Sequence, residues 1–459
     1  MFQSRNARRI IRGAAAIGVT AVLLAAGWGR RSRLPVGDPA GQREDLAAFE
    51  QSFLAVDRAY TPTARAEATR RIAALRGMTG SISDAKFVLS LAQIVALADN
   101  GHTAMLNPGT SPALARVGIR LTPFGEEFYV VRAATANSAL LGGRLMAIDG
   151  VPIARLRDSA RTLRGGIPSW RDRGAPLLLE SPGLLHAMGI VRSAAQATYR
   201  FQLRDGTTRE ATLAPLPDGP ALMGHGPVVV LDPADDGSGW KTLLTPNRAP
   251  WSLQEFGELF RRRDAPELDA IVIQLHANID AGGHSIAAFL EASDSARKAA
   301  HRKNVVLDMR FNGGGNLQLT RDFLRALPSR LDPDARIVVL TSPWTFSAAI
   351  SSTAYLKQAG GERVTLVGEA PGDRLQFWAE GQPVVLPHSG VMLLVATERH
   401  DYLTGCKPFT DCHRPVVQFP ISVKSLAPDV AAPWTIEAYA SGRDPGMEAV
   451  GLTLRRSTR

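Results

Sequence analysis

The 459-residue sequence predicts an α/β domain with a largely parallel core, preceded by a helical region and a β-rich module. Two patterns carry this prediction. In the second half of the chain, short apolar runs alternate with segments of helical period, and between residues 117 and 213 strand-like runs are separated by turn residues. Apolar strands separated by helices are typical of a parallel sheet that is covered on both faces.

The chain begins with a basic and apolar leader. Residues 1–33 contain seven Arg and no acidic residue, and an uncharged run rich in Ala, Val and Leu covers 13–29. A basic flank before a short apolar run is the pattern of a secretory signal. If it is not cleaved, it forms a membrane anchor with its Arg-rich end in the cytoplasm. We expect a signal peptide or anchor over 1–35, and a body that is periplasmic, otherwise exported, or held at the inner membrane by this segment alone.

The formal net charge of +10 raises the question of nucleic-acid binding. Seven of these charges lie in the leader, which leaves +3 for the body. So small a charge gives little reason to expect phosphate binding, and we expect no nucleic-acid partner. The basic cluster at 261–263 is expected to be a solvated helix face.

The body divides into three predicted parts. Residues 36–112 form a helical region, in which the helical pattern ends at the stop signal Asp-Asn-Gly at 99–101. Residues 113–216 form the β-rich module, with a helical insertion over about 158–192, and residues 217–459 form the α/β domain. Its strands are expected at 271–275, 304–309, 337–340 and 364–367, and its helices at 286–298, 317–326 and 348–358.

The β-rich module contains Ile-Asp-Gly-Val-Pro-Ile at 148–153 and a hairpin over 199–213. This stretch resembles a PDZ-like domain, a small β-rich fold that binds extended peptide ends by strand addition. The alternative is a β-rich spacer of unrelated fold.

The two cysteines, Cys406 and Cys412, are separated by five residues. In an oxidising compartment this spacing predicts a disulfide that closes a small loop, in agreement with export. A metal site on these cysteines is disfavoured, because only Asp411 and His413 lie close by and the spacing fits no standard zinc pattern.

Three consecutive glycines follow an expected strand and precede an expected helix, in Asp-x-Arg-x-Asn-Gly-Gly-Gly at 308–315. Glycine lets the backbone turn sharply and approach another chain closely, and free N–H groups near a helix start carry partial positive charge. Such a loop suits a developing oxyanion. The alternatives are a tight strand–helix turn and a nucleotide phosphate loop, and the latter is disfavoured because the Gly-Lys-Ser/Thr tail is missing.

Ser347 stands in Thr-Phe-Ser-Ala-Ala at 345–349, where a short loop leads from a strand into a helix. A serine at a helix start is ordinarily an N-cap. The same position suits a nucleophile, because the Ala348 N–H can then complete an oxyanion hole beside Gly314. A third motif, Asp-x-Gly-His-Thr at 99–103, places His102 in the turn that ends the helical region.

In this order, the histidine motif, the PDZ-like module, the glycine motif and the serine motif resemble the carboxyl-terminal processing (tail-specific) serine peptidase family. The broader relatives of that family include the tricorn protease core and the interphotoreceptor retinoid-binding protein. The resemblance covers roughly 85–450, and Ala-Pro-Asp at 427–429 resembles the family's Pro-Asp segment. It implies a ClpP/crotonase-like catalytic domain, Ser347 as nucleophile, and the backbone N–H groups of Gly314 and Ala348 as oxyanion hole.

The family divides by the base that it uses. One branch uses a Lys that follows the serine in a Gly-Lys-Gly context, whereas the loop at 367–374 of this chain contains no Lys. Arg374 cannot serve, because its guanidinium stays protonated. The other branch uses the histidine of the Gly-His-Thr loop, which His102 matches, and a neutral imidazole is a suitable base near pH 7.

A carboxylate should orient this imidazole. Glu369, Asp373, Glu398 and Asp401 all follow Ser347, and no spacing separates them. Asp373 and Asp401 are taken as the candidates, although Asp401 and its neighbour His400 also suit a structural pair beside the cysteine loop.

The resemblance therefore implies a peptidase that acts on peptides or unfolded proteins through an acyl-enzyme and requires no metal or cofactor. A non-catalytic peptide-binding scaffold of the same fold is the first alternative. An acyl-CoA enzyme of crotonase type is the second, and export disfavours it because CoA would be out of reach.

Overall fold

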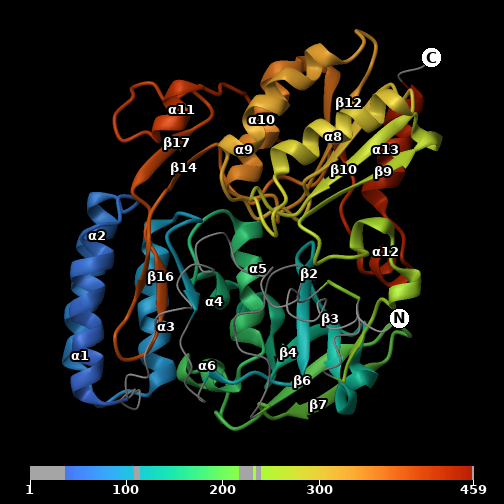
Figure 1. Cartoon of the computed structure of the whole chain (residues 1–459). Coiled ribbons are helices and arrows are strands. Elements are labelled where there is room, and N and C mark those ends of the chain that lie inside the picture. The colour runs from blue at the N-terminus through green and yellow to red at the C-terminus, as the bar shows by residue number, and fades with distance from the viewer. Residues whose placement is uncertain (1–36, 108–113, 217–230, 234–238, 457–459) are drawn as a thin grey trace, which may run out of the picture.

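The computed structural model describes residues 37–107, 114–216, 231–233 and 239–456, so the expected leader lies outside the described residues. A six-stranded sheet, seen in the upper right of Figure 1, has the order β18-β13-β12-β11-β10-β9. All neighbours pair in parallel except β9, which runs antiparallel at one edge, so the predicted parallel core is confirmed. The strands are β9 (Phe260–Ala265), β10 (Ala270–Leu275), β11 (Asn304–Asp308), β12 (Ile337–Thr341), β13 (Val364–Gly368) and β18 (Val430–Ala431).

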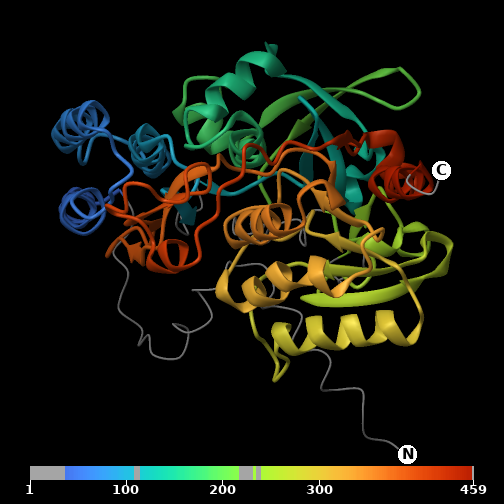
Figure 2. The ribbon, with the colours of Figure 1, turned by 90° about the horizontal axis from the view of Figure 1, so that it is seen from above.

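Helices cover both faces of this sheet (Figure 2). Ile271 and Ile273 of β10 pack in one cluster with helices α8, α9 and α10, whereas Val272 packs on the opposite face with α13. Because successive strand residues point to opposite faces, a strand covered on both sides reads as a continuous apolar run. These helices are α8 (Ile286–Ala299), α9 (Gln318–Ala326), α10 (Ala348–Gly360) and α13 (Pro445–Arg456).

The β-rich module is a second, largely antiparallel sheet with the order β2-β3-β4-β6-β7. Its main strands are β2 (Ile119–Phe124), β3 (Glu127–Ala134), β4 (Arg144–Ile148), β6 (Ala197–Gln202) and β7 (Thr208–Leu213), and two short ones, β5 (Val151–Pro152) and β8 (Trp240–Thr242), pair with β4 and β3. The helical insertion comprises α4 (Ile153–Arg161), α5 (Pro168–Leu179) and α6 (Pro182–Ala187). Strand β8 joins this sheet from beyond the expected boundary at residue 216, and the PDZ-like character of the module stays a prediction.

The N-terminal part consists of α1 (Pro39–Ala48), α2 (Pro62–Gly77) and α3 (Asp84–Val95), with a π-helical turn at Phe49–Leu54 and a 3₁₀ turn at Ala96–Ala98. The chain returns to it late in the sequence: β16 (Met392–Leu394) pairs with β1 (Ala104–Asn107) and with β15 (Pro383–Val385). Leu393 is buried in the same cluster as Phe87 of α3. The remaining elements are β14 (Gln376–Ala379), β17 (Glu398–Asp401), α11 (Arg414–Gln418) and α12 (Ile436–Ser441).

The expectation of a helix at 261–263 is wrong, because these residues form part of the edge strand β9. Arg261 and Arg263 place their guanidinium groups over the Trp251 ring, and Arg262 lies over Phe289. Three identical residues show no hydrophobic periodicity that would distinguish a helix from a strand. Charged side chains on an edge strand discourage pairing with another chain.

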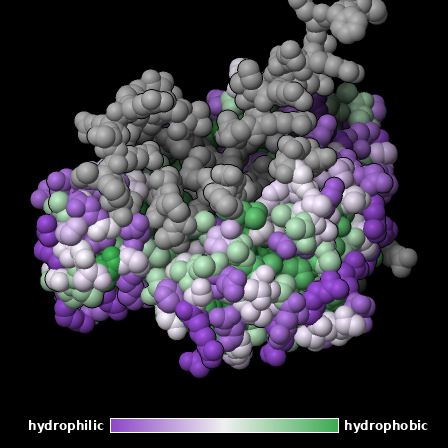
Figure 3. Space-filling model, turned by 90° about the horizontal axis from the view of Figure 1, so that it is seen from below, coloured by the Kyte–Doolittle hydropathy of each residue, from purple (hydrophilic) through white to green (hydrophobic). Residues whose placement is uncertain are grey.

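The surface is mixed in character. On the face seen from below, hydrophilic residues line the outer edge and hydrophobic residues gather toward the middle (Figure 3). Within residues 37–107, 114–216, 231–233 and 239–456, no helix combines the length and the hydropathy that a membrane span requires.

A buried ion network fixes the start of the glycine motif. The Arg310 side chain, 2 % exposed, donates to both carboxylate oxygens of Asp308 (2.9 and 2.7 Å) and to both of Asp444 (2.6 and 3.0 Å). Asp444 lies just before α13, so the network joins the end of β11 to the C-terminal helix. Buried charges are tolerated when they are paired and hydrogen-bonded in this way.

We therefore expect Arg310→Met to lower the free energy of unfolding by about 3–5 kcal/mol, because two buried carboxylates lose their partner. Chemical denaturation measures the change. The control is Arg330→Met, which removes an ion pair to the largely exposed Glu291 and should have a much smaller effect. Equal losses in the two variants would contradict a special role for the buried network.

Candidate active site

The glycine and serine motifs meet because they follow neighbouring parallel strands. The carboxyl ends of β11 and β12 lie side by side in the sheet, so the loops after them share one edge. The Phe346 N–H donates to the Asn312 carbonyl oxygen (3.0 Å), and the Thr345 hydroxyl donates to that of Met309 (2.9 Å). These bonds join the two loops.

The Asn312 side chain shapes the glycine loop from within. Its Nδ2 donates to Oδ1 of Asn278 (2.9 Å), and its Oδ1 accepts from the Gly314 N–H (2.9 Å). Asn278 in turn donates to Ser352 of α10 (2.8 Å). The Gly314 N–H, which the sequence predicts as an oxyanion donor, is therefore already hydrogen-bonded to Asn312. The sequence interpretation missed Asn278, which no motif marks.

Gly314 lies directly against Ser347. Its φ is +107°, and a Cβ added there would lie 2.5 Å from the Ser347 Cβ and 3.1 Å from the Ala348 nitrogen. Only glycine combines this backbone conformation with so close an approach. The two motifs are therefore in contact, as expected for an oxyanion loop beside a nucleophile.

Ser347 occupies the N-cap position just before α10, but its side chain makes no capping hydrogen bond. Its backbone has φ 54° and ψ −126°, which is rare for a residue with a side chain. Such strain is typical of residues held in place at functional sites. Ala348 is the first residue of α10, so its N–H has no acceptor within the helix and points out of the first turn.

Three polar residues hold the histidine loop to distant segments. Asn100 exchanges two hydrogen bonds with the Trp378 backbone (3.0 and 3.1 Å), which ties the loop to β14. Thr103 donates to the buried carboxylate of Asp57 (2.8 Å). Asp99 pairs with both Arg171 and Arg374. The predicted stop is confirmed, since Asp99 has a left-handed backbone after the last helical turn.

The His102 ring lies between two aromatic rings. Its centroid is 4.4 Å from that of Phe346, the residue before Ser347, and 4.9 Å from that of Phe377 in β14. Its Nδ1 lies 3.6 Å from Oδ2 of Asp373. Neither ring nitrogen of His102, nor this Asp373 oxygen, has a hydrogen-bond partner in the described part of the chain. The 3.6 Å separation of Nδ1 and Oδ2 is longer than a hydrogen bond.

Close packing around residue 101 explains why a glycine precedes His102. A Cβ at residue 101 would lie 2.7 Å from Oδ2 of Asp373 and 3.0 Å from the Phe346 ring. The missing side chain lets the histidine loop approach the loops of Asp373 and Ser347.

The other predicted carboxylates are engaged elsewhere. Asp401 accepts hydrogen bonds from the Leu403 and Thr404 backbones, the Thr404 hydroxyl and the Gln376 side chain, so it shapes the turn after β17. Glu398 contacts Nδ1 of His413 (2.6 Å). Burial raises the pKa of Glu369, which accepts a hydrogen bond from the Trp434 backbone.

The helical insertion covers this site. Trp170 of α5 stacks on Phe346 with ring centroids 3.6 Å apart, and Arg173 donates to the Pro343 carbonyl oxygen (2.6 Å). Burial lowers the pKa of Arg164 to about 10, and the charge of Asp373 opposes that shift. Because the insertion covers the site, the His102 side chain is only 8 % exposed and that of Asp373 is 1 % exposed.

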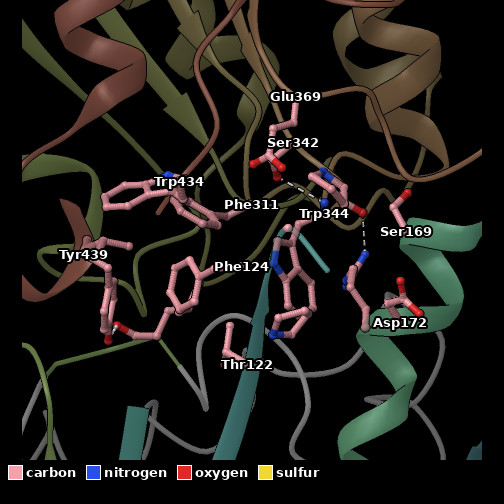
Figure 4. A pocket seen from close by; sticks show the side chains of 16 residues that line it. Thr122, Phe124, Ser169, Asp172, Phe311, Ser342, Trp344, Glu369, Trp434 and Tyr439 are labelled. Atoms are coloured by element: carbon pink, nitrogen blue, oxygen red, sulfur yellow. Dashed lines mark hydrogen bonds between the residues drawn. The ribbon is translucent and has the colours of Figure 1, made fainter. Parts of the chain in front are cut away.

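A cavity of about 190 Å³ borders the serine loop between the β-rich module and the α/β domain (Figure 4). Trp344, Phe311 and Trp434 line it together with Phe124 and Tyr439. Neither Ser347 nor His102 is among the residues that line it. The cavity therefore adjoins the loop that carries Ser347 without containing the Ser347 and His102 side chains.

Cys406 and Cys412 form the predicted disulfide. It closes the loop after β17.

No protein-family model matches the sequence, and no curated protein matches it. Among solved structures, mature CPAF in complex with lactacystin is 13 % identical, with a TM-score of 0.57 over 91 % of this chain and 99 % of the other. A serine-to-alanine mutant of CPAF is also 13 % identical, with a TM-score of 0.59 over 91 % and 97 %. The chain therefore has the fold of mature CPAF.

The photosystem II D1 C-terminal processing protease is 15 % identical over 92 % of this chain and 98 % of its own, with a TM-score of 0.37. That score is too low to bear on the fold.

The contact between Gly314 and Ser347 leads to a prediction. Gly314→Ala should displace Ser347 and slow its reaction with a fluorophosphonate probe by about 100-fold, since a shift of about 1 Å at a reacting group has effects of this size. Labelling rates measured by mass spectrometry test this.

The matched control is Gly313→Ala, because a Cβ at residue 313 meets no atom within 4 Å. This variant should keep nearly the full labelling rate. If both alanines, or neither, slow the reaction, the contact does not position Ser347.

Proposed function

We propose that this protein is a serine peptidase that cleaves peptides or unfolded proteins through an acyl-enzyme on Ser347. The observation that carries the proposal is the meeting of three segments: Ser347 in strained backbone against Gly314, His102 stacked on the residue before it, and Asp373 at 3.6 Å from His102. A nucleophile, a base and an orienting carboxylate are the three groups of a serine–histidine–aspartate triad.

In the proposed reaction, Nε2 of His102 takes the Ser347 hydroxyl proton as the oxygen attacks the substrate carbonyl carbon. Asp373 faces Nδ1, so its charge favours the imidazolium that forms. The C–N bond then breaks as His102 protonates the leaving amine. Water, deprotonated by the same histidine, releases the acid product and regenerates Ser347.

The Ala348 N–H is the first donor to the oxyanion, because no helical acceptor competes for it. For the Gly314 N–H to act as the second donor, its hydrogen bond to Asn312 has to be exchanged for the substrate oxygen. Asn312 and Asn278 thus hold the loop in shape before substrate binds.

The proposal includes export. A basic and apolar segment over 1–35 suits a signal peptide or an inner-membrane anchor, and a disulfide suits the periplasm or another oxidising compartment.

A fluorophosphonate probe tests the nucleophile. The full body of the protein should be labelled at Ser347. Labelling should disappear in Ser347→Ala and fall strongly in His102→Ala, because the hydroxyl then lacks its base. Intact mass and peptide mapping locate the label.

Circular dichroism spectra of both variants serve as the control for folding. Folded wild-type protein that takes up no label would overturn the proposal and indicate a peptide-binding scaffold. Labelling that persists in Ser347→Ala would place the nucleophile elsewhere.

The roles of the two aspartates can be separated. Asp373→Asn should lower kcat for a peptide substrate by a factor on the order of 10³–10⁴ with little change in melting temperature, since the amide no longer favours the imidazolium. Asp401→Asn should keep kcat and lower the melting temperature, because Asp401 accepts the Leu403 and Thr404 hydrogen bonds. The reverse pattern would make Asp401 the orienting residue.

A further inference from the structure

A second group of chemically active side chains lies outside the proposed peptidase machinery. Glu380 follows β14, His400 lies in β17, and His413 follows the disulfide. One potential ligand atom from each lies within 4.8 Å of the others. The disulfide and a hydrogen bond from the His413 N–H to the Arg399 carbonyl oxygen (2.9 Å) bring His413 back beside His400.

The distances converge on one carboxylate oxygen. Nε2 of His400 lies 3.1 Å, and Nε2 of His413 3.9 Å, from Oε1 of Glu380. Bonds from Zn²⁺ to nitrogen or oxygen are about 2.0–2.2 Å, so ligand atoms around a tetrahedral ion lie about 3.4 Å apart. The two distances bracket this value, and all three atoms lie within 4.8 Å of one another, so an ion fits between them once the side chains move closer together.

The outer nitrogen of each ring is already held. Nδ1 of His400 lies 2.7 Å from the Tyr402 hydroxyl, which itself lies 2.5 Å from the Ser351 hydroxyl. Nδ1 of His413 lies 2.6 Å from Oε2 of Glu398. Partners of this kind orient the ring and leave the other nitrogen for a metal, as is usual for histidine ligands. An ion pair between Glu380 and one histidine does not require hydrogen-bond partners on the Nδ1 atoms of both rings.

Burial and donor chemistry point to the class of ion. His400 is 2 % exposed, whereas the Glu380 side chain is 40 % exposed, so the group has a closed inner side and an open outer side. Two imidazoles and one carboxylate suit Zn²⁺ and its neighbours rather than Mg²⁺ or Ca²⁺. The nearby sulfurs are bound in the disulfide and do not serve as thiolate ligands.

We propose that Glu380, His400 and His413 bind one divalent transition-metal ion of the Zn²⁺ class, with water as the fourth ligand on the exposed side. The ion joins the ends of β14 and β17 to the disulfide loop. Phe377 links this group to His102: its ring stacks on His400, with 5.0 Å between centroids, and on His102, with 4.9 Å between centroids. Metal binding thus stiffens the support on which the His102 ring rests.

Titration with Co²⁺ followed by Zn²⁺ competition tests the proposal on the tag-free, oxidised body of the protein. We expect one equivalent of Co²⁺ with visible d–d absorption, no thiolate charge-transfer band, and displacement by Zn²⁺. Glu380→Gln and His413→Gln should weaken binding at least about 100-fold. Glu398→Gln, which removes an outer partner, should weaken it by roughly 10–100-fold.

The control is His284→Gln, an exposed histidine outside the group, which should bind like the wild type. Ser347→Ala should also bind normally, so the result does not depend on the proposed peptidase activity. Zn²⁺ should raise the melting temperature of the wild type and of both controls, but not of His413→Gln. Wild-type protein that binds no Co²⁺ or Zn²⁺, or folded Glu380→Gln and His413→Gln variants with unchanged affinity, would refute the site.

Discussion

The hydrogen bond from the Phe346 N–H to the Asn312 carbonyl oxygen joins the two loops on which the candidate active site is built. It forms because β11 and β12 are parallel neighbours, so their carboxyl ends meet at one edge of the sheet. Once the loops are joined, Gly314 lies against Ser347 and the start of α10 is set. The buried Arg310 network anchors the same edge to the C-terminal helix. The positions of Gly314 and Ser347 therefore depend on β11 and β12 being neighbours in the sheet.

The histidine reaches this edge by another route. It comes from the N-terminal helical part, and it is held by contacts to β14 through Asn100 and to the core through Thr103 and Asp57. Aromatic rings then enclose it, and α5 covers the group with Trp170. Water is largely excluded, so the charge of Asp373 acts on His102 more strongly than it would at the surface.

The periodicity of the sequence predicted the parallel core well, because strands covered on both faces are continuous apolar runs between amphipathic helices. It failed at 261–263, where three arginines have no period and form an edge strand. It also missed that β8 extends the β-rich sheet and that β16 returns to the helical region, since pairing between distant segments leaves little local trace. Gly101 is a local trace of such a contact, because a side chain there would collide with Asp373 and Phe346.

By itself, the sequence determined the strand–helix alternation, the disulfide, and the three motifs that contain Ser347, Gly314 and His102, because these depend on local period, spacing and residue type. Only the tertiary structure decided which carboxylate faces the histidine. Asp373 and Asp401 are equivalent by spacing, but one points at His102 and the other accepts hydrogen bonds from its own turn. It also brought Glu380, His400 and His413 together, since that depends on how β14 and β17 pair and where the disulfide returns the chain.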